Sequence, residues 1–416
     1  MATIVLGAGI ARRPMNGGGP WEKLQWVFGL RRLGFEVYLV DQISRGSCFD
    51  ATGAATSFER SLNLAYFRDV VDMFGLQGGA ALVYGDGEAV EGATHQELFD
   101  RAEAADLLIN FSGKIGWEPL LHCFRRKAYI DTDPGFTQFS GAPASGDSTL
   151  DGYDVYFTVG ENIGHPGCAI PTGGIAWRPL RPPVALSEWP LSTDGNPDHF
   201  TTVATWRGRP FGSQEHAGRT YGLKADEFLK FVELPVRAEQ TFEIALNLEA
   251  PKPVLPDSPY PPQLEPVVRE EVELLRRHHW QLVDPRGVTP DPLAFKRYVQ
   301  QSGAEFSAAK GIYVETRSGW FSERSACYLA SGKPVLVQDT GFARAIPVGE
   351  GIVPFATLEE AVAGARRIAR DYPSHCEAAR RIAEEHFDSE RLLGQMLDEA
   401  GVGRLAAQKR KGVSRW

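Results

Sequence analysis

The sequence predicts an α/β protein with two domains, each built on a doubly wound parallel sheet. In both halves of the chain, apolar runs of strand length alternate with segments whose apolar residues recur at helical spacing. Between roughly Cys168 and Pro197 this pattern gives way to a connection rich in Pro and Trp, with little periodicity. Because strands that alternate with helices form parallel sheets, each half is expected to fold as one such unit.

In the first half, the clearest helix is expected to begin near Pro20, a residue type that suits the first helical position. Leu24, Val27 and Phe28 then recur at helical spacing, and Gly34 fits the C-terminal cap. The expected strands of this half are residues 3–6, 35–40, 106–111, 128–130 and 155–159.

The second half repeats the alternation. Thr357 and Glu360 form a capping-box pattern that predicts a helix start, and residues 264–279 predict another helix. The Pro-rich residues 249–263 are expected to form an exposed loop. The expected strands are residues 200–205, 242–248, 280–283, 311–314, 334–337 and 351–354.

These patterns predict three parts of the chain. Residues 1–185 are expected to form an N-terminal Rossmann-like domain, and residues 186–375 a C-terminal one. Residues 376–416 are expected to form helices that pack back toward the N-terminal domain.

Composition limits the classes of function. The chain has 416 residues and a net charge of -9, and it has no long basic run before Lys409, so a nucleic-acid partner is not expected. Its five cysteines are odd in number and widely spaced, without a C-x-x-C pair, which disfavours a disulfide framework and a zinc site. The start lacks the basic flank of a secretory signal, and no stretch has the length and apolarity of a membrane span. A cytoplasmic protein is expected.

The most informative segment is SGWFSERSACYLASGKPVLVQDTGF, which begins at Ser318. It predicts a polar loop, a helix start, a buried helix and a strand. Free backbone N–H groups at a helix start favour an anion, and a glycine lets the main chain approach closely, so Ser318, Gly319 and Ser322 are candidate phosphate ligands. A glycine-containing turn that merely leads into a helix is the alternative.

Two doubly wound domains, the Gly-rich loop that starts at Asn16 and this segment together resemble nucleotide-sugar glycosyltransferases of the GT-B class. Residues 311–397 are most similar to the donor-binding half of spore-maturation-type glycosyltransferases, and IPTGGIAWRPL is similar to the stretch leading to the hinge of such enzymes. The resemblance implies two Rossmann-like domains facing a cleft, with a nucleotide sugar, expected to be a UDP-sugar, in the second domain and the acceptor in the first. It implies no cofactor besides the nucleotide sugar.

The resemblance also implies roles for charged residues. Arg324 matches a family arginine that neutralises the departing diphosphate, and a solvated surface arginine is the alternative. Arg207 lies where a basic residue touches the diphosphate, with Lys224 as its substitute. Glu323 is a candidate ribose ligand, and a surface glutamate is the alternative. Glu315 and Glu323 reproduce the spacing of the two glutamates of retaining members, but the aligned Ser-Gly-Lys-Pro turn puts the expected glutamates at Gly319 and Cys327. Retention of configuration therefore does not follow.

Two further loops are implied as donor contacts. Asp339 and Thr340 occupy the position at which family members contact the sugar, although a turn with a left-handed Gly341 gives the same pattern. Gly18 and Gly19 would let the donor phosphates or the acceptor approach a helix start, although a tight turn alone also favours glycine.

Asp131-Thr132-Asp133 invites a metal site, but the pair follows a strand of a doubly wound domain and precedes Pro-Gly, so no metal is expected. Either carboxylate could instead be a general base, with Asp131 the first choice; turn-forming aspartates are the alternative. His165 follows a strand and could also act as a base, but an exposed loop histidine is the favoured interpretation.

Other classes fit less well. Gly7-Ala8-Gly9 suggests a dinucleotide site, but Arg12 stands where the third glycine belongs, and neither a G-x-S-x-G elbow nor a Walker loop occurs. The leading hypothesis is a metal-independent glycosyltransferase acting on a small-molecule or natural-product acceptor. A nucleotide-sugar epimerase of the same fold and a non-catalytic nucleotide-sugar-binding partner protein are the alternatives.

Overall fold

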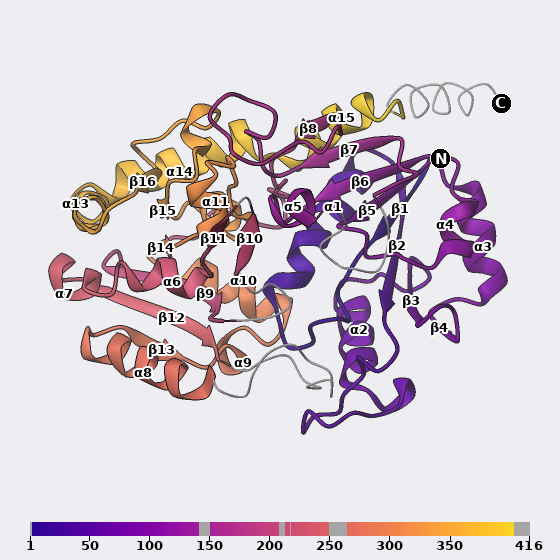
Figure 1. The fold of residues 1–416 in the computed structure, drawn as a ribbon, viewed down its shortest axis with the longest axis horizontal. Coiled ribbons are helices and arrows are strands. Elements are labelled where there is room, and N and C mark those ends of the chain that lie inside the picture. The colour runs from indigo at the N-terminus through magenta and orange to yellow at the C-terminus, as the bar shows by residue number, and fades with distance from the viewer. Residues whose placement is uncertain (1, 141–149, 208–212, 217, 249–263, 403–416) are drawn as a thin grey trace. The chain divides into compact units, whose positions relative to one another are not determined.

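The computed structural model describes residues 2–140, 150–207, 213–216, 218–248 and 264–402 (Figure 1). The chain divides into two compact units. Unit 1 comprises Met1–Gly164, Ile170–Ala185 and Asp388–Trp416, and unit 2 comprises His165–Ala169 and Leu186–Phe387. The Pro-rich loop expected at residues 249–263 lies outside the described residues.

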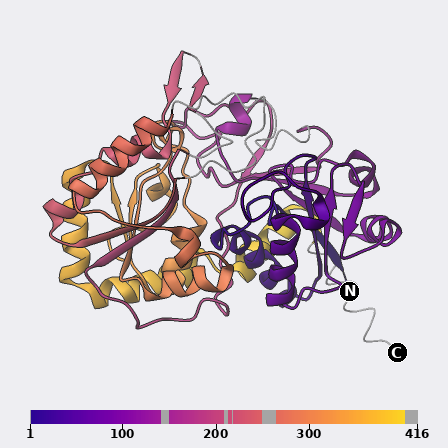
Figure 2. The same ribbon diagram turned by 90° about the horizontal axis from the view of Figure 1, so that it is seen from below.

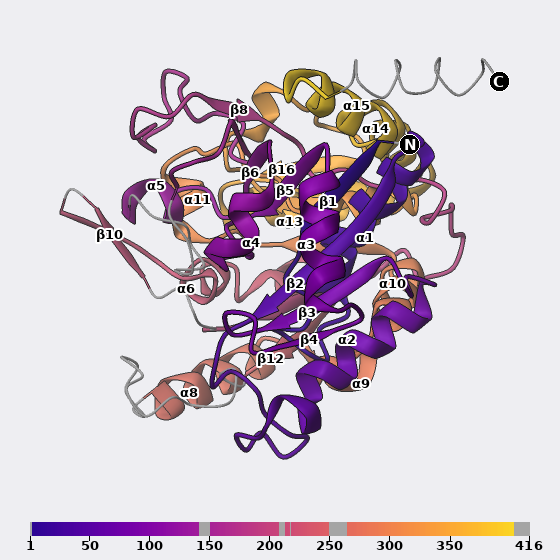
Figure 3. The ribbon, with the colours of Figure 1, turned by 90° about the vertical axis from the view of Figure 1, so that its right-hand side faces the viewer.

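Unit 1 is built on an eight-stranded sheet with the strand order β4-β3-β2-β1-β5-β6-β7-β8 (Figure 3). Neighbouring strands pair in parallel, except that β3 and β4 are antiparallel. Its elements are β1 (Thr3–Gly7), α1 (Gly18–Arg32), β2 (Glu36–Ile43), η1 (Phe58–Arg60), α2 (Leu62–Met73), β3 (Ala80–Tyr84), β4 (Ala89–Glu91), α3 (His95–Ala104), β5 (Leu107–Phe111), α4 (Glu118–Cys123), β6 (Lys127–Asp131), α5 (Phe136–Ser140), β7 (Val155–Thr158), β8 (Trp177–Pro179) and α15 (Ser389–Glu399).

Helices lie on both faces of this sheet because the chain winds in opposite directions from β1. From β1 it proceeds through α1 to β2 and through α2 to β3, and from β5 it proceeds through α4 to β6. Right-handed crossovers in opposite directions put helices on opposite faces. Leu98 of α3 and Leu120 of α4 pack against Val5 and Leu108 of the sheet, and Figure 1 shows α3 and α4 on one side of the strands and α1 and α2 on the other.

Unit 2 is built on a six-stranded sheet with the order β13-β12-β9-β14-β15-β16, paired in parallel throughout. Helices lie on both sides of it (Figure 2). Its elements are β9 (His199–Thr205), the antiparallel hairpin β10 (Gln214–His216) and β11 (Arg219–Tyr221), α6 (Lys224–Leu229), α7 (Leu234–Ala238), β12 (Thr241–Asn247), α8 (Leu264–Arg277), β13 (Gln281–Val283), α9 (Pro285–Val288), α10 (Pro292–Gln301), β14 (Ala304–Ser307), α11 (Gly311–Glu315), α12 (Glu323–Ala330), β15 (Val335–Gln338), η2 (Phe342–Arg344), β16 (Ile352–Phe355), α13 (Leu358–Arg370) and α14 (Tyr372–His386).

An aromatic cluster forms much of the core of unit 2. Phe306 of β14 lies 5.3 Å from Phe228 of α6, 5.8 Å from Phe242 of β12 and 5.5 Å from Trp280, measured between ring centroids. All four rings are at most 3% exposed. Edge-on and tilted contacts at these separations are favourable and fix α6 against the strands, which positions the residues at the start of that helix.

The expected fold class is confirmed, since both sheets are doubly wound and largely parallel. The capping box at Thr357 is also confirmed, and Gly34 follows α1 with a φ of 83°. One strand was wrong. Residues 311–314 belong to helix α11, and the strand that precedes them is β14, which the sequence pattern missed.

The close packing of α15 against α1 provides a test. A Cβ on Gly29 of α1 would lie 2.8 Å from Cβ of Ser389 and 2.7 Å from Cδ1 of Leu393, both in α15. We expect Gly29→Ala to lower the free energy of unfolding by about 1–3 kcal/mol, because overpacking forces the helices apart. The matched control is Gly394→Ala in α15, where nothing lies within 4 Å of the added atom; it should raise stability by about 0.5–1 kcal/mol. Urea unfolding of both variants measures the difference, and equal stabilisation by both would contradict this packing.

Candidate active site

The candidate site lies at the carboxyl edge of the sheet of unit 2, where the strand order reverses. β9 continues along the chain toward β12 on one side, while β14 pairs with its other side. In open parallel α/β sheets, ligands bind outside the carboxyl ends of the strands at such a point. The pairing between β9 and β14 is short, covering Phe200 with Ala304 and Thr201 with Glu305, so the two strands leave backbone groups beyond it for other partners.

The side chain of Arg324, in α12, bonds to both strands at this point. Its Nη1 donates to the carbonyl oxygen of Val203 in β9 at 2.9 Å, its Nε to Oε1 of Glu305 at 2.6 Å and its Nη2 to Oγ of Ser307 at 2.8 Å. The side chain of Arg324 is 12% exposed and that of Glu305 is fully buried. Burial is the largest single cause and would lower the pKa of Arg324, but the charge and the hydrogen bond of Glu305, with smaller effects of Tyr328 and Glu323, together raise it. Arg324 therefore joins two strands, and Glu305 already compensates its charge.

The helix start expected from the sequence is present. Ser322 is the N-cap of α12, and its Oγ accepts a hydrogen bond from the backbone N–H of Arg324 at 3.2 Å. Ser322 is buried, whereas Glu323 is exposed at the first helical position. Of these two candidate donor ligands, only the Glu323 side chain is open to solvent.

The loop before α12 is engaged by the loop after β15. The backbone N–H of Gly319 donates to the carbonyl oxygen of Thr340 at 2.8 Å, and Oγ1 of Thr340 donates to the carbonyl oxygen of Trp320 at 2.5 Å. Oγ of Ser318 donates to the carbonyl oxygen of Tyr313 at 3.2 Å. Ser318 and Thr340 are at most 1% exposed. In this conformation these groups are occupied within the chain, unlike the open phosphate cradle expected from the sequence.

Asp339 lies at the accessible end of the same loop. Its Oδ1 accepts from the backbone N–H of Gly341 at 2.7 Å, and Gly341 has a φ of 91°, so the left-handed turn that was the alternative for this segment is present. Oδ2 of Asp339 lies 4.0 Å from the guanidinium of Arg317, and the Asp339 side chain is 27% exposed. The carboxylate can therefore accept a hydrogen bond from a ligand hydroxyl.

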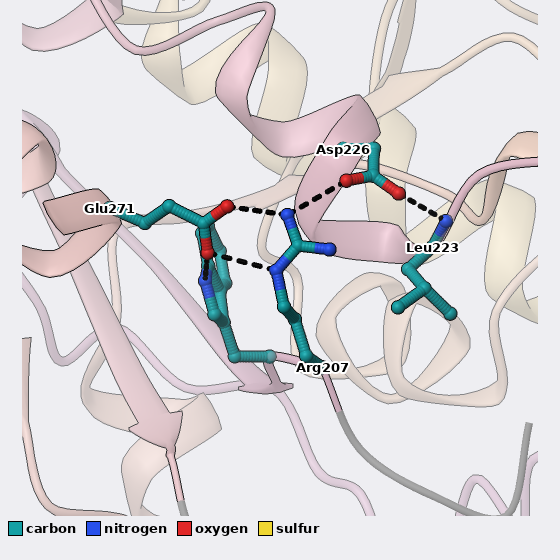
Figure 4. A network of polar contacts seen from close by, with 5 residues as sticks. Arg207, Leu223, Asp226 and Glu271 are labelled. Atoms are coloured by element: carbon teal, nitrogen blue, oxygen red, sulfur yellow. Dashed lines mark hydrogen bonds and ion pairs between the residues drawn. The ribbon is translucent and has the colours of Figure 1, made fainter. Parts of the chain in front are cut away.

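Arg207 follows β9 and is held by two carboxylates (Figure 4). Its Nε donates to Oε2 of Glu271 in α8 at 2.9 Å, and its Nη2 donates to Oδ1 of Asp226 in α6 at 2.8 Å and to Oε1 of Glu271. Oδ2 of Asp226 accepts the backbone N–H of Leu223 at 2.7 Å. These contacts raise the pKa of Arg207, chiefly through the hydrogen bond with Glu271. Arg207 thus fixes the start of α6.

Lys224 is the first residue of α6, directly after the turn that Arg207 fixes. Among the residues that the structure describes, its ammonium group has neither a hydrogen-bond partner nor an ion-pair partner. Burial, followed by the positive charges of Arg324 and Lys310, lowers its pKa to about 7, against the smaller opposing effect of Glu323 and Glu305. Lys224 is therefore a half-buried cation that lacks a counterion.

Lys310 adds a second ammonium group near this point. It is the N-cap residue of α11, its Nζ donates to the hydroxyl of Tyr313 at 3.1 Å, and the Tyr313 ring stacks on Trp320 with centroids 4.7 Å apart. The backbone N–H of Gly311 donates to the carbonyl oxygen of Gly222 at 3.1 Å, which ties α11 to the turn before α6. Cations from three separate segments, Lys224, Lys310 and Arg324, thus meet at one edge of the sheet, and a site of this charge favours an anion.

In unit 1, the Gly-rich loop leads directly into α1, which begins at Gly18. The backbone N–H of Gly19 donates to Oδ1 of Asn16 at 3.1 Å and is already capped. Gly19 is exposed and Gly18 is half-buried. The loop therefore offers access for a ligand but not a free amide at Gly19.

Asp131 ends β6 and is fully buried. Its Oδ2 accepts from Gln138 and from Thr158, both at 2.8 Å, and its Oδ1 accepts from the backbone N–H of Asp133 at 3.2 Å. Burial is the largest cause that raises the pKa of Asp131, to about 6. An enclosed carboxylate cannot touch a substrate in this conformation, whereas Asp133 is half-buried. His165 is exposed in its loop, which agrees with the alternative noted for it.

Sequence patterns missed Glu305 and Lys310. Strand β14 was not recognised because the charged residue Glu305 interrupts its short apolar run. Only the tertiary contact with Arg324 explains why Glu305 is buried. The one signal in the sequence was the oppositely charged Arg324 at the next predicted helix start, which could have indicated a buried ion pair with Glu305. Lys310 follows β14, and its position at the strand's carboxyl end becomes evident once that strand is assigned.

Across the described ranges, no group of three or more His, Cys, Asp or Glu side chains could hold a metal ion. No helix within those ranges is both long enough and apolar enough to cross a bilayer. All five cysteines lie in the described ranges, and none of them forms a disulfide.

No protein-family model and no curated protein sequence matches the chain. Solved structures do match it. An α-glucosyltransferase (AGT) in complex with UDP has 12% identity and a TM-score of 0.59, covering 96% of this chain and 100% of that one. AviGT4, a glycosyltransferase involved in avilamycin A biosynthesis, has 14% identity and a TM-score of 0.53, covering 98% of both chains. Anabaena Alr3699/HepE in complex with UDP-glucose has 11% identity and a TM-score of 0.54, covering 96% of this chain and 100% of that one.

These likenesses extend over nearly the whole chain and establish its fold as that of GT-B glycosyltransferases, with two Rossmann-like units. Several matching structures of the α-glucosyltransferase also contain DNA, among them complexes with a 13-mer.

The buried pair of Arg324 and Glu305 leads to a stability prediction. We expect Arg324→Ala to lower the free energy of unfolding by about 3–5 kcal/mol, because it leaves the Glu305 charge buried without a partner. The double variant Arg324→Met with Glu305→Leu should lose less, since no charge is then left in the interior. Arg286→Ala is the control, because Arg286 is 53% exposed and pairs with an exposed Asp284, and it should cost under about 1 kcal/mol. Urea unfolding measures all three; equal losses in Arg324→Ala and the control would refute the structural role.

Proposed function

We propose that the protein is a metal-independent glycosyltransferase that moves a sugar from a nucleotide diphosphate donor, a UDP-sugar, to a small-molecule acceptor. The observation that carries the proposal is the uncompensated Lys224 ammonium group at the carboxyl edge of unit 2. The named neighbours support the donor class, since the α-glucosyltransferase was solved with UDP and HepE with UDP-glucose. The net charge of -9 favours a small acceptor over a nucleic acid.

In the proposed reaction, the bond between the anomeric carbon and the β-phosphate oxygen breaks, and both electrons stay on that oxygen. An acceptor oxygen bonds to the anomeric carbon and loses its proton. Negative charge develops on the diphosphate in this step, so fixed cations placed there lower the barrier. We assign this contact to Lys224 and Lys310, with Arg324 setting their local field and Arg207 positioning Lys224.

We retain Glu323 and Asp339 as donor contacts, because both carboxylates reach solvent at the same edge of the sheet. Glu323 is proposed to accept hydrogen bonds from the ribose, and Asp339 from the sugar. For the proton of the acceptor we propose Asp133 as base rather than Asp131, since Asp131 is enclosed and holds the backbone of Asp133. We also propose, from the sequence, a closer resemblance to spore-maturation-type enzymes and a cytoplasmic location.

Lys224 provides a direct test of donor binding. We expect Lys224→Met to weaken UDP-glucose binding by about 10- to 100-fold, because a charge-assisted hydrogen bond is lost. Lys296→Met in α10 is the matched control and should leave the affinity unchanged. Calorimetric titration of the folded variants measures the difference. Equal affinities in all three proteins would remove Lys224 from the site and the proposal with it.

The pKa of Lys224 also predicts a pH dependence. A bound diphosphate favours the charged ammonium, so the protonated form binds and the pKa of Lys224 rises on binding. Since that pKa is about 7 in the free protein, the affinity for UDP-glucose should be constant below pH 7 and fall as the pH rises toward 9. Lys224→Arg keeps its charge over this range and should give a flat profile. A wild-type profile as flat as that of Lys224→Arg would argue against the contact.

Activity separates transfer from its alternatives. Release of UDP from a UDP-sugar only when an acceptor from a panel of small molecules is present would support transfer. Accumulation of an epimer from UDP-N-acetylglucosamine alone would show an epimerase instead. Binding without UDP release across the panel would show a nucleotide-sugar-binding protein.

A further inference from the structure

Unit 1 carries a second group of basic residues at its own sheet edge. Arg12 and Arg13 follow β1, Lys114 follows β5, and Lys23 lies in α1. The strand order of this sheet reverses between β1 and β5, so these residues lie at the point where open parallel sheets bind ligands. We refer to Arg12, Arg13, Lys23 and Lys114 as the unit 1 basic cluster.

Contacts bring the cluster together. Nη2 of Arg12 donates to the carbonyl oxygen of Lys114 at 3.1 Å. The stem of Lys114 passes over Gly9, where an added Cβ would lie 3.3 Å from Cδ of Lys114. A larger residue at position 9 would crowd this stem, so the backbone here accommodates the lysine closely.

The charges of the cluster are only partly compensated. Lys23 pairs with Glu22 at 2.5 Å, and Arg12 donates to the neutral carbonyl oxygen of Gln42 at 2.9 Å. Within the part of the chain that the structure describes, neither the Lys114 ammonium nor the Arg13 guanidinium has a hydrogen-bond or ion-pair partner.

The pKa of Lys114 reflects the positive charges around it. Burial is the largest cause that lowers its pKa, to about 7, followed by the positive charges of Arg12 and Arg13. Asp133 acts in the opposite direction, and Lys23 adds a smaller lowering effect. A half-buried lysine among other cations is costly unless an anion neutralises it, so an anionic ligand would stabilise the cluster.

We propose that the unit 1 basic cluster binds a phosphate group of the acceptor, so that the acceptor substrate is a phosphate monoester. This inference rests on the proposed function. Unit 2 supplies Lys224 and Lys310 for the donor diphosphate, which leaves Lys114 and Arg13 for a different anion. Two positive charges without a described partner, on Lys114 and Arg13, match the charge of a phosphate dianion.

Competitive acetylation of the full chain with acetic anhydride at pH 7.5, followed by mass spectrometry, tests the two sites separately. Lys114 and Lys224 should both react faster than ordinary lysines, because a larger fraction of each is unprotonated. We expect glucose 6-phosphate to slow acetylation of Lys114 at least fivefold and to leave Lys224 unchanged. Glucose should protect neither, and UDP should protect Lys224 alone.

The outcomes discriminate between the proposals. Failure of glucose 6-phosphate to protect Lys114, while UDP protects Lys224, overturns the acceptor inference and leaves the donor site standing. Protection of Lys114 by UDP shows that the cluster binds the donor and also overturns the inference. Failure of UDP to protect Lys224 argues against the proposed function, whatever happens at Lys114.

Two variants sharpen the result. Arg13→Gln changes an exposed side chain without a described partner, so the fold should persist, and we expect it to reduce the protection of Lys114 by glucose 6-phosphate at least threefold. Lys127→Gln, at the start of β6 in the same unit, is the control and should not change the protection. Equal protection in wild type and Arg13→Gln would overturn the role of the cluster.

Discussion

The ion pair between Arg324 and Glu305 is the constraint on which the site of unit 2 depends. β9 and β14 pair only briefly where the strand order reverses, and the guanidinium of Arg324 bonds both strands beyond that point. Because the pair is buried, neither residue can be replaced alone at low cost. The start of α12 is thereby fixed to the carboxyl edge of the sheet, and a positive charge is fixed with it.

The structure separates cations that hold the protein together from cations that are available to a ligand. Arg207 and Arg324 are each engaged by carboxylates, whereas Lys224 has no described partner and its pKa falls to about 7. A charge that the protein compensates internally contributes little to the binding of an anion, because its field is already neutralised nearby. The surplus charge at the site thus comes from Lys224, at the helix start that Arg207 fixes.

Much of the fold could be predicted from the sequence because its signals are local. The strand and helix alternation, the capping box at Thr357 and the glycine after α1 each depend on neighbouring residues, and the structure contains all of them. Strand β14 was missed since its charged Glu305 is buried only through a contact with Arg324, nineteen residues later. The short apolar segment at α11 fits a strand or a helix equally well by pattern, and its tertiary surroundings make it helical.

The sequence by itself determined the two doubly wound units, the helix start at Ser322 and the residue types available at the sheet edges. Only the tertiary structure decided which of those residues are free. Ser318, Thr340 and Asp131 are enclosed, while Lys224 and Lys114 keep ammonium groups without described partners. The physical reason is that burial and charge compensation depend on groups that are distant in the chain. Their distances from one another are set only when the sheet forms, so no local spacing pattern in the sequence contains them.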